Sequence, residues 1–307
     1  MDMMSRRVES ISISYFKNSI SSPYTIFEEI IKKFKEELLL KKRMVSGGDK
    51  LMEKLSKQPL LEVVFELHWK SKKGYPDPNY KLIIGSFYDH IKSRFPVFEP
   101  LMTASIPEEA IPPNNRIVQY RFWSKNKVWP VVQLGSGIIT VNMNKDYESW
   151  NKFKPVIEEV IDNFLKSHPS IENLILEKLI LRYIDVLPFD FSKNNVLDYI
   201  RNKLHVNLII DLGDDQRKTK LSEAPINIDL KLEHLISEPE GILGFRFFKA
   251  TIEGRDVLAM ESYVISREYP QIEFSREPIG VWLDKAHNMT DFIFSSLIRG
   301  ELLEELK

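Results

Sequence analysis

The segment Leu60–Trp69 alternates between apolar and polar residues, and this alternation is the feature that most constrains the fold. Side chains at every second position share one face of an extended strand. One face of this segment is apolar and the other is mostly polar, with Val63, Phe65, Leu67 and Trp69 on the first and Glu62, Val64, Glu66 and His68 on the second. The segment therefore predicts a strand buried on one face.

Further strand-like segments predict two antiparallel meanders, because short turn sequences separate their members. They lie at 117–123, 129–134 and 138–143 in the first half, and at 178–187, 226–236, 245–252 and 258–267 later in the chain. A helical stripe led by Trp150 follows the first set, and a helix at 278–297 that contains Trp282 follows the second. The prediction is an α+β fold whose halves, about 58–190 and 191–307, each end in a meander and a packing helix. This parallel indicates an internal duplication.

Residues 1–51 differ in pattern from the predicted body at 52–307. Apolar residues recur at helical spacing between Pro23 and Met44, behind a capping box formed by Thr25 and Glu28. This predicts an amphipathic helix, joined to the body by a glycine-containing linker at 45–50. A second interpretation stays open, in which translation begins at Met52, because codons for the Gly-Gly-Asp stretch can contain a prokaryotic ribosome-binding sequence.

Composition excludes several classes of function. The chain has no cysteine, which excludes disulfides, thiolate metal sites and cysteine nucleophiles. Lys and Arg number 43 against 44 Asp and Glu, so no global field draws the chain to nucleic acid or an anionic membrane. No apolar run approaches a membrane span or a secretory signal, which predicts a cytoplasmic protein. The missing cysteine, with abundant Lys, Glu and Ile, is typical of proteins from hot environments or from an AT-rich genome.

The polar face of the first strand supplies the leading catalytic candidates, Glu62, Glu66 and His68. Neighbouring positions on one strand face are about 7 Å apart, a spacing at which carboxylates and an imidazole hold a divalent metal or share acid–base chemistry. The simpler interpretation is a solvated polar face of a half-buried strand. The usual phosphate-binding, dinucleotide, zinc-protease and serine-hydrolase motifs are absent from the sequence, which favours that interpretation.

Two charged residues, Arg182 and Asp185, lie in an apolar strand and point to opposite faces. Each therefore needs a partner. We expect Arg182 to pair with Glu62 or Glu66, which makes either a structural ion pair or an anion-binding site.

In the last helix Asp284, His287 and Asp291 stand at i, i+3 and i+7, which is a metal-binding spacing on one helix face. That face lies opposite the apolar stripe of the helix, so we expect it to be exposed to solvent.

Two weaker sets point to nucleic acid. Arg121 and Trp123 belong to a hairpin in which basic and aromatic residues interleave, which resembles a single-strand binding surface or is an ordinary hairpin. The acidic residues and the lysine of a nuclease core are matched loosely by Asp211, Asp214, Asp215, Asp229 and Lys231.

Three segments together resemble a sporadically distributed family of uncharacterised prokaryotic proteins. They are Pro59–Trp69, Leu181–Asp185 and Trp282–His287, and the resemblance covers roughly residues 58–300. It implies defence or mobile-element neighbourhoods but carries over no catalytic residue. Asp185 stands where asparagine is commoner in that family.

The sequence thus favours a non-catalytic binding or interaction protein, with an unknown protein partner and no predicted cofactor. The rival hypothesis is a metal-dependent hydrolase or nuclease that uses a divalent metal held by Glu62, Glu66 and His68 or by Asp229 and Lys231. Nucleic-acid binding is a third and less favoured hypothesis, and no membrane association is expected.

Overall fold

The computed structural model describes residues 55–307, except 75–76, 108–109, 113–114, 145, 212–219, 223 and 269–271. The helix predicted within residues 23–44, the linker at 45–50 and the alternative start at Met52 lie outside this range, as do Asp214 and Asp215. Residues Leu55–Lys307 form one unit by their internal contacts.

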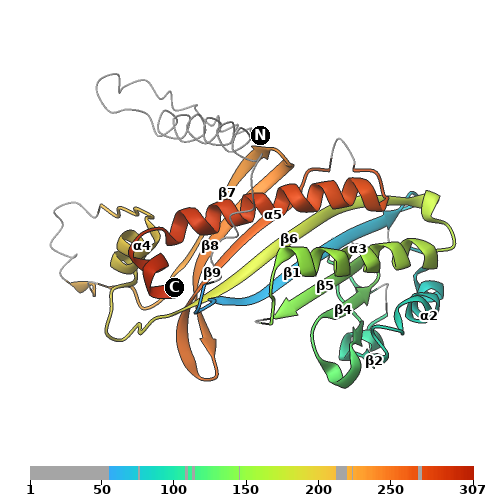
Figure 1. Cartoon of the computed structure of the whole chain (residues 1–307), viewed down its shortest axis with the longest axis horizontal. Coiled ribbons are helices and arrows are strands. Elements are labelled where there is room, and N and C mark those ends of the chain that lie inside the picture. The colour runs from blue at the N-terminus through green and yellow to red at the C-terminus, as the bar shows by residue number, and fades with distance from the viewer. Residues whose placement is uncertain are drawn as a thin grey trace, which may run out of the picture. The chain divides into compact units, whose positions relative to one another are not determined.

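The described part of the chain is built on a nine-stranded antiparallel sheet (Figure 1). Its strand order is β2-β3-β4-β5-β1-β6-β9-β8-β7. In chain order the strands are β1 (Leu60–Ser71), β2 (Val97–Pro100), β3 (Tyr120–Trp123), β4 (Val131–Gly135), β5 (Ile138–Asn144), β6 (Leu174–Pro188), β7 (Asp229–Ser237), β8 (Glu240–Ile252) and β9 (Arg255–Ser266). The helices are α2 (Tyr80–Ile91), α3 (Trp150–Ser167), α4 (Val196–Leu204), α5 (Arg276–Ile298) and α6 (Glu301–Leu306).

The α+β prediction and both meanders are confirmed, but the two halves share one sheet. Strand β1 pairs with β5 on one side and with β6 on the other, so it joins the halves at the centre. Each half contains a leading strand, a short helix, a meander whose last strand pairs with the leading strand, and a long helix. Strand β6 (Leu174–Pro188) occupies a position in this order that corresponds to that of β1, since each is followed by a helix and pairs with the last strand of the next meander.

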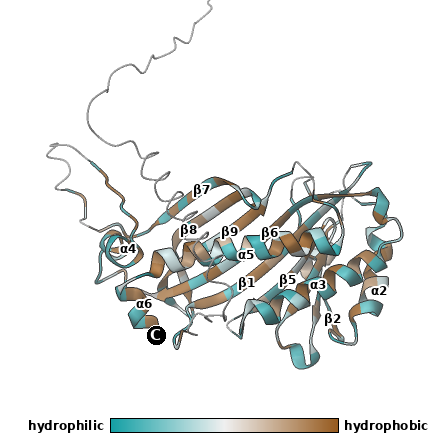
Figure 2. Ribbon diagram, turned by 45° about the horizontal axis from the view of Figure 1, so that its top comes forward, coloured by the Kyte–Doolittle hydropathy of each residue, from teal (hydrophilic) through white to brown (hydrophobic). Residues whose placement is uncertain are grey.

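The helix-covered face of the sheet holds the main core. Val63, Phe65, Leu67 and Trp69 have no exposed surface, as the alternation predicted. Helices α2, α3 and α5 supply the other side of this core, with Trp69 packing on Phe164 of α3 at 4.6 Å between ring centroids. Figure 2 shows apolar residues along the strands beneath α3 and α5. Burial of this much aromatic and aliphatic surface is the dominant stabilising contribution.

A second, smaller core lies where α4, α6 and the C-terminal end of α5 meet the ends of β6, β8 and β9. Its members include Leu187, Ile200, Met260, Leu297 and Leu302. Thr290 of α5 is buried, and its hydroxyl donates to the carbonyls of Ala286 and His287 in the same helix.

None of the described helices is long and apolar enough to cross a bilayer.

A buried carboxylate–imidazole pair fixes the loop after β1. Asp77 Oδ2 accepts hydrogen bonds from Trp69 Nε1 at 3.1 Å and from His168 Nε2 at 2.9 Å. His168 Nδ1 accepts from the backbone N–H of Ser170, which leaves its proton on Nε2. Burial raises the pKa of Asp77, but the His168 hydrogen bond and the other donors outweigh it and hold that pKa below its ordinary value. Since both side chains are closed off from solvent, the pair is structural.

Candidate functional site

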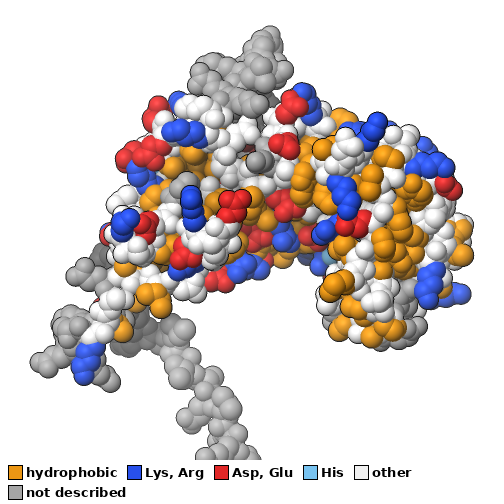
Figure 3. Space-filling model, turned by 90° about the horizontal axis from the view of Figure 1, so that it is seen from below, with side chains coloured by type: hydrophobic (Ala, Val, Ile, Leu, Met, Phe, Trp, Pro, Cys, Tyr) orange, Lys and Arg blue, Asp and Glu red, His pale blue; other side chains and the backbone are white. Residues whose placement is uncertain are grey.

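The face of the sheet opposite α2, α3 and α5 carries a band of polar side chains. Figure 3 shows a hollow in the surface within which acidic and basic side chains gather. On the central strands these side chains alternate with fully buried apolar residues, so each points away from the main core. This open face is where the first strand places its predicted candidates.

Val64 of β1 lies at the centre of this polar band, as the pairing of the strands shows. Asn142 of β5 stands opposite Val64 on one side, and Arg182 of β6 stands opposite it on the other. Along β1 itself, Glu62 and Glu66 flank Val64 on the same face. An apolar floor is therefore framed by two carboxylates, an amide and a guanidinium.

A cleft of about 510 Å³ opens over this frame. Thr103, Arg116, Ile117 and Val118, from the segment between β2 and β3, form one wall. The sheet side is lined by Glu62, Val64, Glu66, Gln133, Ile138, Thr140, Asn142, Arg182 and Ile184. This volume is large enough for a small ligand or for one or two side chains of a partner.

A directed chain of hydrogen bonds runs across four strands and ends on Glu62. Arg121 Nε donates to Gln133 Oε1 at 2.9 Å, and Gln133 Nε2 donates to Thr140 Oγ1 and Asn142 Oδ1 at 3.2 and 3.3 Å. Thr140 Oγ1 also donates to Asn142 Oδ1 at 2.7 Å. Asn142 Nδ2 then donates to Glu62 Oε1 at 2.7 Å. The chain fixes one oxygen of Glu62 and orients its carboxylate on the cleft floor.

On the other side of Val64, Arg182 lies between two carboxylates. Its nitrogens are 3.4 Å from Glu66 Oε1 and 3.2 Å from Glu261 Oε1, and its Nε has no hydrogen-bond partner within the described residues. The expected partnership with Glu66 is confirmed, whereas Glu62 makes no ion pair within the described residues. Both distances exceed those of ordinary charge-assisted hydrogen bonds, so the guanidinium is held loosely.

Glu66 and His68 form a short hydrogen-bonded contact, with 2.8 Å between Glu66 Oε2 and His68 Nε2. Burial raises the pKa of Glu66, but the hydrogen bond with His68 and the charge of Arg182 outweigh it and hold that pKa below its ordinary value. Glu66 therefore remains a carboxylate at neutral pH. His68 is buried and does not line the cleft.

The band continues to the far edge of the sheet through paired side chains. Arg246 donates twice to Asp229 at 2.6 Å, and Lys231 lies 2.8 Å from Glu233. Asp229 and Lys231, the nuclease-like candidates, thus each pair with a different residue and do not converge on one metal or substrate site. Asp211 is described, but the structure gives no contact that joins it to them.

The polar face of the last helix, which was predicted to be exposed, is partly covered by α3, and its three candidates Asp284, His287 and Asp291 are half-buried. Trp150 Nε1 donates to Asp284 Oδ1 at 2.9 Å, and Lys154 Nζ lies 2.6 Å from Asp284 Oδ2. The ring of His287 stacks on Trp150 with 4.5 Å between centroids. The expectation failed because the helical wheel of one helix does not show which neighbour packs beside it.

His287 is consequently half-buried. Its Nδ1 lies 2.9 Å from the hydroxyl of Tyr183, and burial lowers its pKa to about 4, against the opposing effect of Asp284. Within the described residues, no group of three or more histidine, aspartate or glutamate side chains is arranged to hold a metal ion. Neither Glu62, Glu66 and His68 nor Asp284, His287 and Asp291 form such a group.

The aromatic hairpin uses its polar groups internally. Trp123 Nε1 donates to Glu99 Oε2 at 2.6 Å, and its ring meets Trp129 edge-on at 5.5 Å between centroids. Arg121 is directed to Gln133, as described above. The two residues proposed for nucleic-acid contact are therefore engaged within the sheet.

Asp185 lies on the helix-covered face, so the predicted opposition to Arg182 is confirmed. It is 3% exposed, and its Oδ2 has no hydrogen-bond partner in the described part of the chain. Burial raises its pKa to about 7. Asp185 lies outside the cleft.

Four site residues were missed by the reasoning from sequence, namely Gln133, Thr140, Asn142 and Glu261. A usable signal existed, because Thr140 and Asn142 alternate with apolar residues that are fully or almost fully buried, as Glu62 and Glu66 do in β1. The sequence did not show that the pairing of β4, β5 and β1 places the polar residues of these strands side by side in one band.

Comparisons with known proteins add little to this geometry. No family model matches the sequence, and no curated protein matches it. Among solved structures, the chain is similar to DynU16, a protein of the dynemicin biosynthetic locus, with 10% identity and a TM-score of 0.23 over 76% of this chain and 99% of that one. A likeness this distant supports no inference about fold or activity.

Proposed function

We propose that this protein is a non-catalytic binding or interaction protein whose cleft on the open sheet face recognises an amine-bearing group. The observation that carries the proposal is the state of Glu62. Of the charged residues that line the cleft, Arg116 is compensated by Glu177 at 2.6 Å and Arg182 by Glu66 and Glu261. Glu62 is held only by the neutral amide of Asn142 among the described residues.

A half-buried carboxylate without a counter-ion favours a cation brought by a ligand. The surroundings specify the rest of that ligand, because Val64 and Ile184 lie directly beside Glu62 in the register and are apolar. A primary ammonium on an aliphatic stem meets both requirements, with the charge on Glu62 and the stem over Val64 and Ile184. The lysine side chain of a partner protein has this chemistry, which supports the unknown protein partner.

The experiment compares the peptides Gly-Lys-Gly and Gly-norleucine-Gly, which differ only in the ammonium group. We expect the lysine peptide to raise the thermal unfolding midpoint by mass action and the norleucine peptide to leave it unchanged. Glu62→Gln keeps an acceptor for Asn142 but removes the charge, and should abolish the rise. Asp229→Asn, an acidic residue of the same face outside the cleft, is the matched control and should retain it.

Equal effects of the two peptides, or equal loss in both variants, would contradict the proposal. Because the attraction is between a partly exposed charge and an ammonium, the rise should also shrink as salt is added.

The rival function, a metal-dependent hydrolase, is supported by the short contact between Glu66 and His68 and lacks a metal-ligand group within the described residues. A midpoint raised by Mg²⁺ or Mn²⁺ in the native protein and not in Glu66→Gln would favour it over the binding proposal.

Two further proposals rest on pattern alone. The repeated order of strand, helix, meander and helix supports an origin by internal duplication. The family resemblance and the composition support a prokaryotic, cytoplasmic protein, from a hot environment or an AT-rich genome, encoded near defence or mobile elements.

A further inference from the structure

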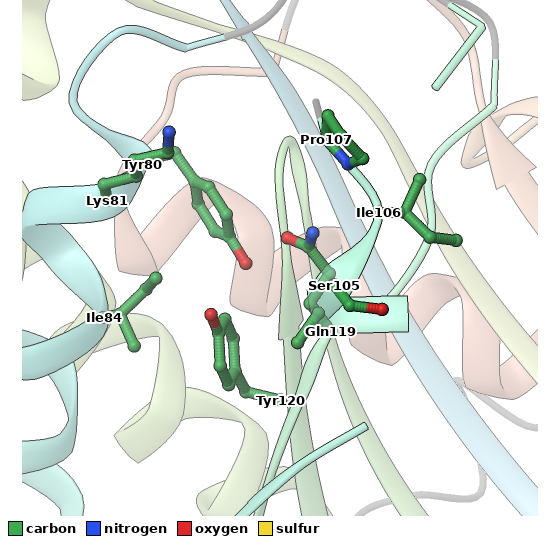
Figure 4. Close-up of a pocket in the computed structure, with 9 residues that line it drawn as sticks. Tyr80, Lys81, Ile84, Ser105, Ile106, Pro107, Gln119 and Tyr120 are labelled. Carbon is green, nitrogen blue, oxygen red and sulfur yellow. The ribbon is translucent and has the colours of Figure 1, made fainter. Parts of the chain in front are cut away.

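A second pocket, separate from the cleft, lies between α2 and the segment that leads into β3. Its volume is about 200 Å³. Figure 4 shows Tyr80 and Ile84 of α2 on one side, Ile106 and Pro107 on the other, and Gln119 with Tyr120 from the sheet.

Gln119 carries a polar atom that the protein does not satisfy. The side chain is 4% exposed, and its Nε2 donates to the backbone carbonyl of Thr103 at 3.4 Å. Its Oε1 is buried and has no hydrogen-bond partner among the described residues. A buried acceptor left unpaired is costly, by about 1–3 kcal/mol. Since Gln119 lines the pocket, a ligand N–H or O–H placed there would remove this cost.

Two tyrosine hydroxyls also border the pocket, while the hydroxyl of Ser105, another lining residue, donates to the carbonyl of Met102. Figure 4 shows the hydroxyls of Tyr80 and Tyr120 directed into the same space as the amide of Gln119. A phenol hydroxyl both donates and accepts, so it can donate to a ligand carbonyl. The pocket thus pairs a fixed acceptor with hydroxyl donors.

The lining also decides the charge of a ligand. No described carboxylate lines the pocket, and its cationic member, Lys81, is an exposed residue of α2. Among the residues that the structure describes, a charged group enclosed there would find no buried counter-ion, which is strongly unfavourable. The apolar side chains of Ile84 and Ile106 favour a flat, uncharged body.

We infer that this pocket is a binding site for a small, uncharged lactam, in which an N–H stands next to a C=O on one edge of a planar ring. The N–H donates to Gln119 Oε1, and the carbonyl accepts from a tyrosine hydroxyl. The inference goes beyond the cleft and is independent of it, because the two cavities share no lining residue.

The test uses 2-pyridone and N-methyl-2-pyridone, which differ in the N–H alone. Binding to the full chain is measured by ligand-observed NMR. We expect 2-pyridone to bind with a millimolar Kd and the N-methyl form to bind at least about tenfold more weakly, since loss of one buried hydrogen bond is worth about that factor.

Variants distinguish the pocket from other surfaces. Gln119→Leu should weaken 2-pyridone binding by about tenfold or more, and Tyr120→Phe gives a second variant should the leucine variant fail to fold. The control is Tyr88→Phe. Tyr88 lies on α2, as the lining residue Tyr80 does, but does not itself line the pocket, so this variant should bind 2-pyridone normally. Absence of 2-pyridone binding at about 10 mM, equal binding of the N-methyl form, or binding unchanged in both pocket variants would overturn the inference. None of these outcomes bears on the lysine-peptide experiment at Glu62.

Discussion

The two faces of strands β1 and β6 differ although their residues are interleaved. On the helix-covered face Phe65 and Leu181 are fully buried among apolar neighbours. On the open face Glu62, Glu66 and Arg182 are held by hydrogen bonds and ion pairs around a cleft. Buried apolar area stabilises strongly, while paired polar groups stabilise weakly but orient precisely placed atoms. One face therefore supplies most of the stability, and the other orients polar groups around the cleft.

Strand β6 places two of its charged residues, Arg182 and Asp185, in different surroundings. Arg182 has Glu66 and Glu261 beside it, whereas Asp185 on the helix-covered face has no counter-ion within the described residues. On the open face Arg182 is compensated by neighbouring carboxylates, whereas on the helix-covered face Asp185 can lose its charge by binding a proton.

The largest effect should come from removing a core side chain next to an open-face one. Phe65→Ala should lower the free energy of unfolding by about 3–5 kcal/mol, since it leaves a cavity among fully buried residues. Val64→Ala, one residue away on the open face, should cost about 1 kcal/mol or less. Urea denaturation measures both. Equal losses would mean that the open face is as closely packed as the core, and the comparison would fail.

The second effect depends on pH and concerns Asp185. Burial raises its pKa from the ordinary 3.8 to about 7 in the folded protein, so between these pH values the folded state holds a proton that the unfolded state releases. Stability contributed by this group is therefore lost as pH rises from about 4 to about 7. Asp185→Asn should match the native protein near pH 4 and exceed it by up to about 4 kcal/mol near pH 8.

Urea denaturation of both proteins from pH 4 to pH 8 measures this difference. Asp284→Asn is the matched control, because hydrogen bonds from Lys154 and Trp150 overcome the effect of burial and keep the pKa of Asp284 below its ordinary value. Its stability relative to the native protein should not improve as pH rises. A flat difference for Asp185→Asn would show that Asp185 has a partner in the native protein.

The smallest changes in stability should come from two glycine-to-alanine substitutions, one on the open face of the sheet and one at an exposed position of α2. A Cβ at Gly244 would lie 2.1 Å from the ring of Tyr263, which would displace that ring and its 2.6 Å hydrogen bond to Glu233. Gly244→Ala should cost about 1–3 kcal/mol. Gly85 of α2 has nothing within 4 Å of such a Cβ, so Gly85→Ala should stabilise by about 0.5–1 kcal/mol. We expect the thermal unfolding midpoint to fall in Gly244→Ala and to rise in Gly85→Ala. An unchanged midpoint in Gly244→Ala would show that the polar band is loosely packed there.

Local pattern predicted the elements well. The alternation in Leu60–Trp69 identified both the buried and the polar face of β1, and the turn sequences located both meanders. It did not predict that β1 and β6 pair with each other, because a strand pattern shows which face is buried but not which strand is its neighbour. The division near residue 190 therefore stays a prediction.

The candidate site was predicted only in part. Glu62, Glu66 and Arg182 were identified because charged residues in half-buried strands need partners. Asn142 and Gln133 were missed, since they reach Glu62 through pairings between residues far apart in the sequence. Likewise, the helical wheel of α5 placed His287 on the polar side correctly but could not show Trp150 stacked on it.

The sequence by itself determined the α+β class, the strand and helix segments, the apolar face of the sheet and the absence of cysteine chemistry. These follow from local periodicity and composition, which each segment carries wherever it lies. The tertiary structure decided that two meanders form one sheet, that Glu62 has no counter-ion among the described residues while Arg182 has two, and that Gln119 presents an unpaired acceptor to a pocket. These depend on contacts between distant segments, and the free energy of such contacts is set by register and packing, which no single segment contains.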